Sequence, residues 1–109
     1  MATNYKVLGQ VSPGAQSLTS LYTVPSATQT IASTLIVCNR GVFFERYRIA
    51  IRVDGQSVSD KDYIAYDTEI GANDSMNITV GLTLNSGDVV SVYSSSNLLS
   101  FSLYGSEIS

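Results

Sequence analysis

Three of the chain's four arginines lie on alternate positions of one short stretch, FERYRIAIRV, at residues 44–53. Arg46, Arg48 and Arg52 fall on one set of alternating positions, and apolar residues from Tyr47 onward fill the other set. This alternation predicts a strand whose apolar side faces the core, so the arginines project from the opposite face. Guanidinium groups bind carboxylates in a bidentate manner, which makes recognition of acidic groups the chemistry that this pattern offers.

Three explanations compete for this arginine stripe (Arg46, Arg48 and Arg52). The first is a solvated face whose charge is neutralised by acids on neighbouring strands or turns, with Asp67 and Glu69 as the candidates. The second is a protein partner, since arginine is enriched at interfaces. The third is nucleic acid, which a net charge of −3 disfavours.

The sequence provides few groups that could catalyse a reaction. It contains no histidine, so nucleophile systems that depend on histidine and the usual zinc sites cannot be assembled. The single cysteine, Cys38, lies in the apolar run TLIVC and is predicted to be a small core side chain. No glycine-rich loop has the spacing of a phosphate-binding loop. We therefore predict a protein with no enzymatic activity, no cofactor and no metal.

Six carboxylates fall within twenty-one residues and need a separate check. Their spacing lacks the alternation of a calcium-binding loop, and a bare sandwich rarely supplies the cleft that a pair of glycosidase acids needs. We interpret them as solvated turn residues, with an adventitious or interface cation as the alternative. They are Asp54, Asp60, Asp62, Asp67, Glu69 and Asp74.

Period-two alternation, interrupted by Gly, Pro, Asn and Asp, recurs along the chain and predicts short strands. In the third run, Ile31, Leu35 and Val37 should share one face, and the apolar end LIVC indicates a strand covered on both sides. The run at 62–70 is looser and has room for one helical turn. The predicted strands are 5–10, 18–24, 28–39, 44–53, 62–70, 75–84, 89–94 and the last run, LLSFSLYG, with Leu99, Phe101 and Leu103 inward.

This pattern predicts an all-β fold: an antiparallel β-sandwich of seven or eight short strands, of jelly-roll or immunoglobulin-like topology. Residues 1–109 should form one domain, with residues 1–10 as either an N-terminal arm or an edge strand. We expect no signal peptide and no membrane helix, and synthesis in a cytoplasm.

The order of segments along the chain resembles that of small virion structural proteins of tailed bacteriophages. The resemblance extends from Tyr5 to Ile108 and rests on YKVLGQ, LYTVPSAT, STLIVCNR, YRIAIR, YIAYDTEIGAND, GLTLNSGDVVSVYSS and LSFSLYGSEI. It implies a non-enzymatic β-sandwich in the virion, acting as a capsid decoration (cement) protein or as a tail-fibre, baseplate or adaptor component.

We expect a decoration protein that bridges major capsid subunits, with itself, as a dimer or trimer, and the major capsid protein as partners. Strand addition by the N-terminal segment would be its mode of contact, and deletion of residues 1–10 would abolish binding and leave a folded domain. A tail component and a host glycan-binding module are the alternatives; nucleic acid and membrane are not expected. The candidate interface residues are Tyr5, Lys6, Val7, Arg46, Arg48 and Arg52.

Overall fold

The computed structural model describes residues 2–109, apart from the side chain of Val80, and consists almost entirely of antiparallel strands. Two short 3-10 turns, η1 (Val53–Gly55) and η2 (Asp60–Asp62), lie between the fourth and fifth strands. The strands are β1 (Thr3–Val11), β2 (Thr19–Thr23), β3 (Gln29–Asn39), β4 (Glu45–Arg52), β5 (Tyr63–Ile70), β6 (Ser75–Leu84), β7 (Val89–Ser94) and β8 (Leu99–Ile108).

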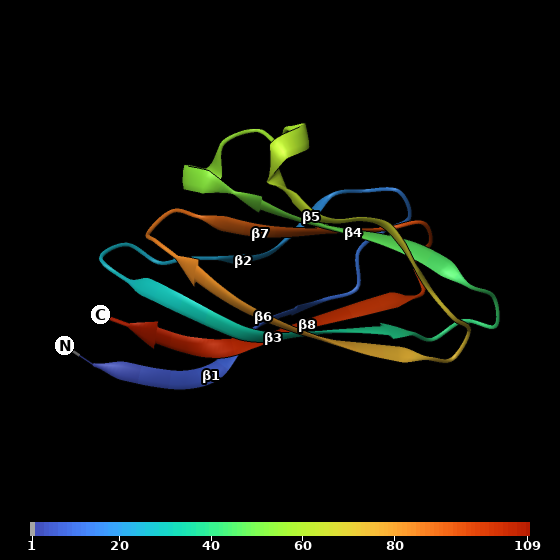
Figure 1. Ribbon diagram of the computed structural model, residues 1–109, viewed down its shortest axis with the longest axis horizontal. Helices are drawn as coiled ribbons and strands as arrows, with labels where there is room; N and C mark the ends of the chain where they lie inside the picture. Colours follow the sequence, from blue (N-terminus) through green and yellow to red (C-terminus); the bar gives the residue numbers. More distant parts are fainter. Residues whose placement is uncertain (1) are drawn as a thin grey trace.

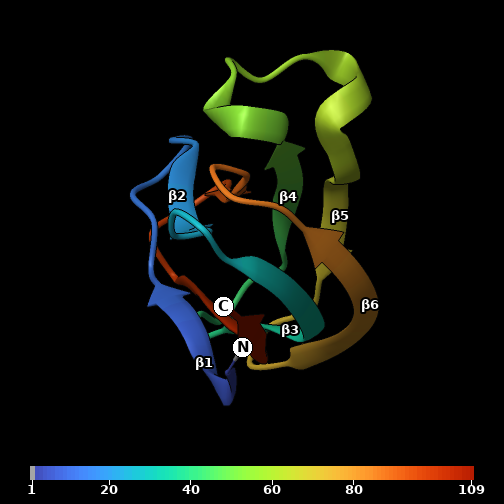
Figure 2. The same ribbon diagram turned by 90° about the vertical axis from the view of Figure 1, so that its left-hand side faces the viewer.

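The eight strands form two four-stranded sheets, in the orders β1-β8-β3-β6 and β2-β7-β4-β5. Their pairing is nested: β1 pairs with β8, β2 with β7, β3 with β6 and β4 with β5. This is the order of a jelly roll, in which a long folded-over hairpin wraps into two packed sheets. Figures 1 and 2 show the two layers, with both termini at one end of the molecule. The predicted sandwich is confirmed. Of the two predicted topologies, jelly-roll and immunoglobulin-like, the structure has the jelly roll.

The core lies between the two sheets and is made by the inward residues of each strand. Tyr47 and Phe101 meet across it with ring centroids 6.2 Å apart and planes at 74°. Such edge-to-face contacts add to the stabilisation that burial of the two rings provides. The predicted inward positions of β4 and β8 are confirmed by the buried side chains of Tyr47, Ile49, Leu99, Phe101 and Leu103.

The predicted facing of β3 is wrong at its start because the strand contains a bulge. The register with both neighbouring strands shifts between Ala32 and Thr34, so alternation restarts after Ser33. Leu35 and Val37 are buried as predicted, whereas Ile31 is exposed on the outer face. A bulge moves every side chain on one side of it to the opposite face of the sheet, and no residue in this part of the sequence signals the bulge at Ser33.

Three other local predictions also need correction. Ile36 and Cys38 are only half-buried, because β3 is central within its sheet but its outer face is not covered by another layer. Val53, which was expected to face the core, is exposed, because β4 ends at Arg52 and Val53 is the first residue of η1. Residues 63–70 form a strand with no helical turn inside it, and the 3-10 turn η2 comes directly before this strand.

Residues 3–11 form an edge strand rather than a free arm. β1 is hydrogen-bonded to β8 along its length and contributes Leu8 to the core. Deletion of residues 1–10 would therefore remove a strand and expose the edge of β8. The structure thus has the second of the two predicted alternatives, the edge strand, and we no longer expect deletion of residues 1–10 to leave a folded domain.

Gly105 provides a stability test of the close strand approach at the bulge. A Cβ atom there would collide with the backbone carbonyl of Ile31 and lie 2.9 Å from the Cα of Ala32. We expect Gly105→Ala to lower the free energy of unfolding by about 2–3 kcal/mol, because backbone atoms cannot move aside as a side chain can. Gly14→Ala is the matched control, since nothing lies within 4 Å of its added methyl group. Equal urea midpoints for the two variants would contradict this account.

Candidate functional site

Two residues of the arginine stripe, Arg46 and Arg48, are paired with carboxylates of the neighbouring strand β5. Arg46 Nη2 lies 2.8 Å from Glu69 Oε1, and Arg48 Nε lies 2.7 Å from Asp67 Oδ1. The antiparallel register places Arg46 directly opposite Glu69, which confirms the two acids expected from the sequence. Because these charges are neutralised within the chain, they give little reason to expect an acidic partner on this face.

Arg48 is also stacked between two tyrosines on the outer face of this sheet. Its guanidinium carbon lies 4.2 Å from the ring centroid of Tyr66 and 4.3 Å from that of Tyr93. The hydrogen bond between Arg48 and Asp67 raises the pKa of the guanidinium and lowers the pKa of the carboxyl. The stacking and the ion pair together fix the positions of these side chains.

Arg52 donates hydrogen bonds within its own chain. Its guanidinium reaches the hydroxyl of Ser91 at 3.2 Å and the carbonyl oxygens of Gly55 and Gln56 at 3.4 and 3.3 Å. These contacts fasten the segment after η1 to the sheet. Arg52 therefore has a structural role that the sequence did not indicate.

The other predicted candidates, Tyr5, Lys6 and Val7, lie on β1, and all three line one groove. Tyr5 and Val7 are exposed on the outer face and line a shallow, mostly apolar groove of about 480 Å³ with Ile31 and Tyr104. Ile31 reaches this groove because of the bulge at Ser33. An exposed apolar groove beside an edge strand is a surface where a second protein can bind.

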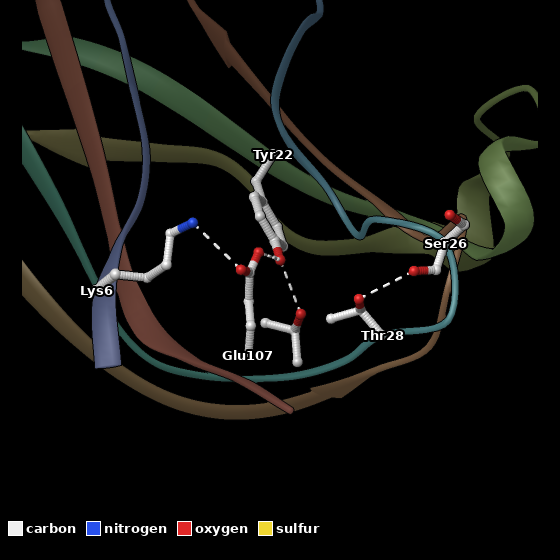
Figure 3. Close-up of polar contacts among 6 residues, drawn as sticks. Lys6, Tyr22, Ser26, Thr28 and Glu107 are labelled. Atoms are coloured by element: carbon white, nitrogen blue, oxygen red, sulfur yellow. Dashed lines mark hydrogen bonds and ion pairs between the residues drawn. The ribbon is translucent and has the colours of Figure 1, made fainter. Parts of the chain in front are cut away.

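Lys6 also belongs to a polar cluster with Glu107 and Tyr22, which Figure 3 shows in close-up. Its Nζ atom lies 3.2 Å from Glu107, whose other carboxylate oxygen accepts a 2.5 Å hydrogen bond from the hydroxyl of Tyr22. The Tyr22 oxygen also lies 2.8 Å from the hydroxyl of Thr30. These contacts join β1, β2, β3 and β8. The cluster was missed in the sequence because Tyr22 and Glu107 are 85 positions apart.

The cluster gives a pH-dependent prediction. Burial, together with the hydrogen bond to Glu107, raises the pKa of Tyr22 from 10.0 to about 12. The folded state thus holds this proton more tightly than the unfolded chain. The stabilisation is complete below about pH 10 and is lost as pH rises toward about 12. Between about pH 8 and 11.5, the urea midpoint should fall more for the wild type than for Tyr22→Phe. Tyr5→Phe, at an exposed tyrosine, should behave as the wild type; parallel pH profiles for the wild type and Tyr22→Phe would contradict the assignment.

The most exposed apolar cluster is the loop between β3 and β4, at the end of the molecule opposite the termini (Figure 1). Val42, Phe43 and Phe44 are 71%, 74% and 57% exposed, and we call these three residues the apolar loop. Leu98, on the neighbouring β7–β8 connection, is also exposed. Consecutive large apolar side chains in water indicate a contact site, because scattered single residues are the usual pattern on a free surface.

The apolar loop is held by a buried asparagine. Asn39 is 1% exposed, and its Nδ2 atom donates to the carbonyl oxygens of Phe43 at 2.9 Å, Gly71 at 3.1 Å and Ile70 at 3.4 Å. Its Oδ1 atom accepts a hydrogen bond from the backbone N–H of Gly41 at 2.9 Å. One side chain thus joins both ends of the loop to the β5–β6 turn. A loop held in this way presents its side chains at a lower entropic cost of binding.

Sequence reasoning did not identify the apolar loop as a site. Phe44 was assigned to the start of the arginine strand, and Val42 and Phe43 were not considered. A signal was present, since VFF follows Asn39-Arg40-Gly41 and lacks the alternation of the flanking strands. A run of three apolar residues is equally consistent with a buried strand end, and only the structure shows that it is exposed.

The acidic segment does not form a metal site within residues 2–109, where no group of three potential ligands converges. Asp62 and Asp74 instead accept hydrogen bonds from backbone N–H groups of turns, as expected for turn carboxylates. Across the same residues, the helical segments are too short and too polar to span a bilayer.

Comparison with known proteins gives no independent assignment. No protein-family model matches the chain, and a search of curated proteins finds no relative. The assignment of function therefore rests on the surfaces described above and on the sequence resemblance.

Proposed function

We propose that the protein is a non-enzymatic structural component of a tailed-phage virion: a capsid decoration (cement) protein that bridges neighbouring major capsid subunits and stabilises the head. The observation that carries the proposal is the exposed and rigidly held apolar loop at one end of a small jelly roll. The order of sequence segments supports the virion context, and jelly rolls recur in capsid proteins, which is an argument by analogy of fold.

The apolar loop suits a protein pocket better than a lipid surface. Glu45 follows the loop directly, and Asp74 lies at its base, where its carbonyl accepts a hydrogen bond from the N–H of Asn39. Arg40 and Arg46, which also flank the loop, balance these carboxylates, so the loop has no excess of positive charge that would attract anionic headgroups. In a protein interface, by contrast, a central aromatic pair surrounded by polar groups is the usual form of an energetic hot spot.

Two surfaces would allow one molecule to bridge several subunits. The apolar loop would bind the shell, and the groove beside Tyr5 and Val7 would contact a neighbouring copy of the chain. The free edge of β1, at the end of its sheet, can extend that contact by strand addition. Loop and groove come from different ends of an elongated molecule of 45 × 27 × 19 Å, a suitable arrangement for a bridging protein.

Labelling of the virion tests the proposal. Gold-labelled antibody against this protein should decorate the head of the phage that encodes it at regular positions. Label confined to the tail would favour the second candidate, a tail-fibre, baseplate or adaptor component. Virions that carry no label, although the antibody recognises the protein in infected cells, would overturn both.

A further inference from the structure

The outer face of the second sheet also contains an aromatic corner, formed by Tyr63 and by Tyr66, the ring against which Arg48 stacks. The rings of Tyr63 and Tyr66 lie with centroids 4.9 Å apart and planes at 85°. Together with Asp60 they line a shallow pocket of about 350 Å³. This volume is at the lower end of the range of about 300–1,000 Å³ for small-molecule sites. Perpendicular rings beside a carboxylate form a pocket with apolar walls and one strong hydrogen-bond acceptor.

The corner is fixed before any ligand arrives. Arg48 is stacked against Tyr66 and is itself held by Asp67 through contacts of 2.7 and 3.4 Å. The turn that carries Asp60 is closed by a capping box between Ser59 and Asp62. Asp62 is occupied by this box, whereas Asp60 is exposed and faces the pocket. Preorganisation of this kind reduces the entropic cost of binding.

The charges around the corner favour a neutral ligand. A cation on the tyrosine rings would compete with Arg48, whose positive charge already lies against Tyr66. An anion would be repelled by Asp60, and the two nearby cations are paired within the chain, Arg48 with Asp67 and Lys61 with Asp62. A neutral sugar ring avoids both the competition with Arg48 and the repulsion by Asp60. Its C–H face packs on an aromatic ring, and its adjacent hydroxyls donate to a carboxylate.

We infer that Tyr63, Tyr66 and Asp60 form a binding site for a neutral pyranose unit of a carbohydrate. The inference does not depend on capsid attachment. The corner lies near the end of β4 that is remote from the apolar loop, since Tyr63 pairs with Ala50 and the loop precedes Glu45. A molecule attached through the apolar loop would leave this site accessible to solvent.

Titration of the isotope-labelled protein, followed by NMR, tests the site. Glucose, galactose, mannose and N-acetylglucosamine are the neutral probes; tetramethylammonium and N-acetylneuraminic acid are the charged ones. At least one neutral sugar should give saturable shifts centred on residues 60–66, with a Kd on the order of millimolar because a single ring makes few contacts. Asp60→Asn should weaken this binding tenfold or more, and Tyr66→Ala should abolish it.

Tyr5→Ala is the matched control, because Tyr5 is an exposed tyrosine on the other sheet, and it should leave sugar binding unchanged. A thermal melt of each variant separates loss of the site from loss of the fold; Asp60→Asn is the decisive variant if Tyr66→Ala unfolds. The inference is overturned if no neutral sugar saturates, if tetramethylammonium or N-acetylneuraminic acid saturates the same amides more tightly, or if binding survives Asp60→Asn undiminished.

Discussion

Replacement of Phe43 and Phe44 together by serine is expected to abolish attachment to phage heads while leaving the fold intact. Both rings are largely exposed in the isolated chain, so their removal should disturb core packing little. In a complex they would be buried anchors, and truncation of such residues commonly costs about 2–4 kcal/mol each. Affinity should therefore fall at least about 100-fold.

Co-sedimentation with heads that lack the protein provides the measurement. Tyr66→Ser is the control, because Tyr66 is a comparably exposed aromatic residue remote from the apolar loop and should bind as the wild type does. Undiminished binding of the double serine variant, with an unchanged melting temperature, would show that another surface makes the contact.

The second large effect is expected at Asn39, through stability rather than direct contact. Asn39→Asp keeps the shape of the side chain but replaces the donating Nδ2 atom with an oxygen that faces the carbonyls of Phe43, Gly71 and Ile70. A buried, unpaired carboxylate at this position should lower the free energy of unfolding by about 3–5 kcal/mol at neutral pH.

The sign of the pH dependence identifies the cause. Burial against carbonyl oxygens would raise the pKa of the introduced carboxyl above its unfolded value of about 3.9. The penalty would therefore be smallest below that pH and would grow as pH rises through the folded-state pKa. Asn77→Asp, at an exposed position of β6, is the control and should change stability little. A penalty independent of pH would mean that the asparagine acts through packing alone.

The sequence was informative where alternation was regular. The inward faces of β4 and β8 followed from period-two spacing, and the pairing of Arg46 and Arg48 with Glu69 and Asp67 was one of three explanations considered for the stripe. Spacing could not decide between a jelly-roll and an immunoglobulin-like topology, because strand order depends on contacts between distant segments. The bulge at Ser33 reversed the facing of Ile31 without any local signal.

The candidate surfaces were less predictable than the strands. Tyr5 and Val7 were identified as contact residues, but their groove requires Ile31 and Tyr104 from strands that only the fold brings together. Only Phe44 of the apolar loop was assigned, to the start of a strand, and the exposure of the loop depends on how Asn39 folds the chain back. Exposure of an apolar side chain is a property of the tertiary structure, and local sequence carries little information about it.

The central claim is that this chain acts by attachment to a protein shell through Val42, Phe43 and Phe44. A cryo-electron microscopy reconstruction of the virion is the most direct measurement. The account predicts density for the jelly roll on the outer surface of the head, with the β3–β4 end seated in a pocket between major capsid subunits and the termini pointing away. A jelly roll attached through another face, with the β3–β4 loop in solvent, would contradict it.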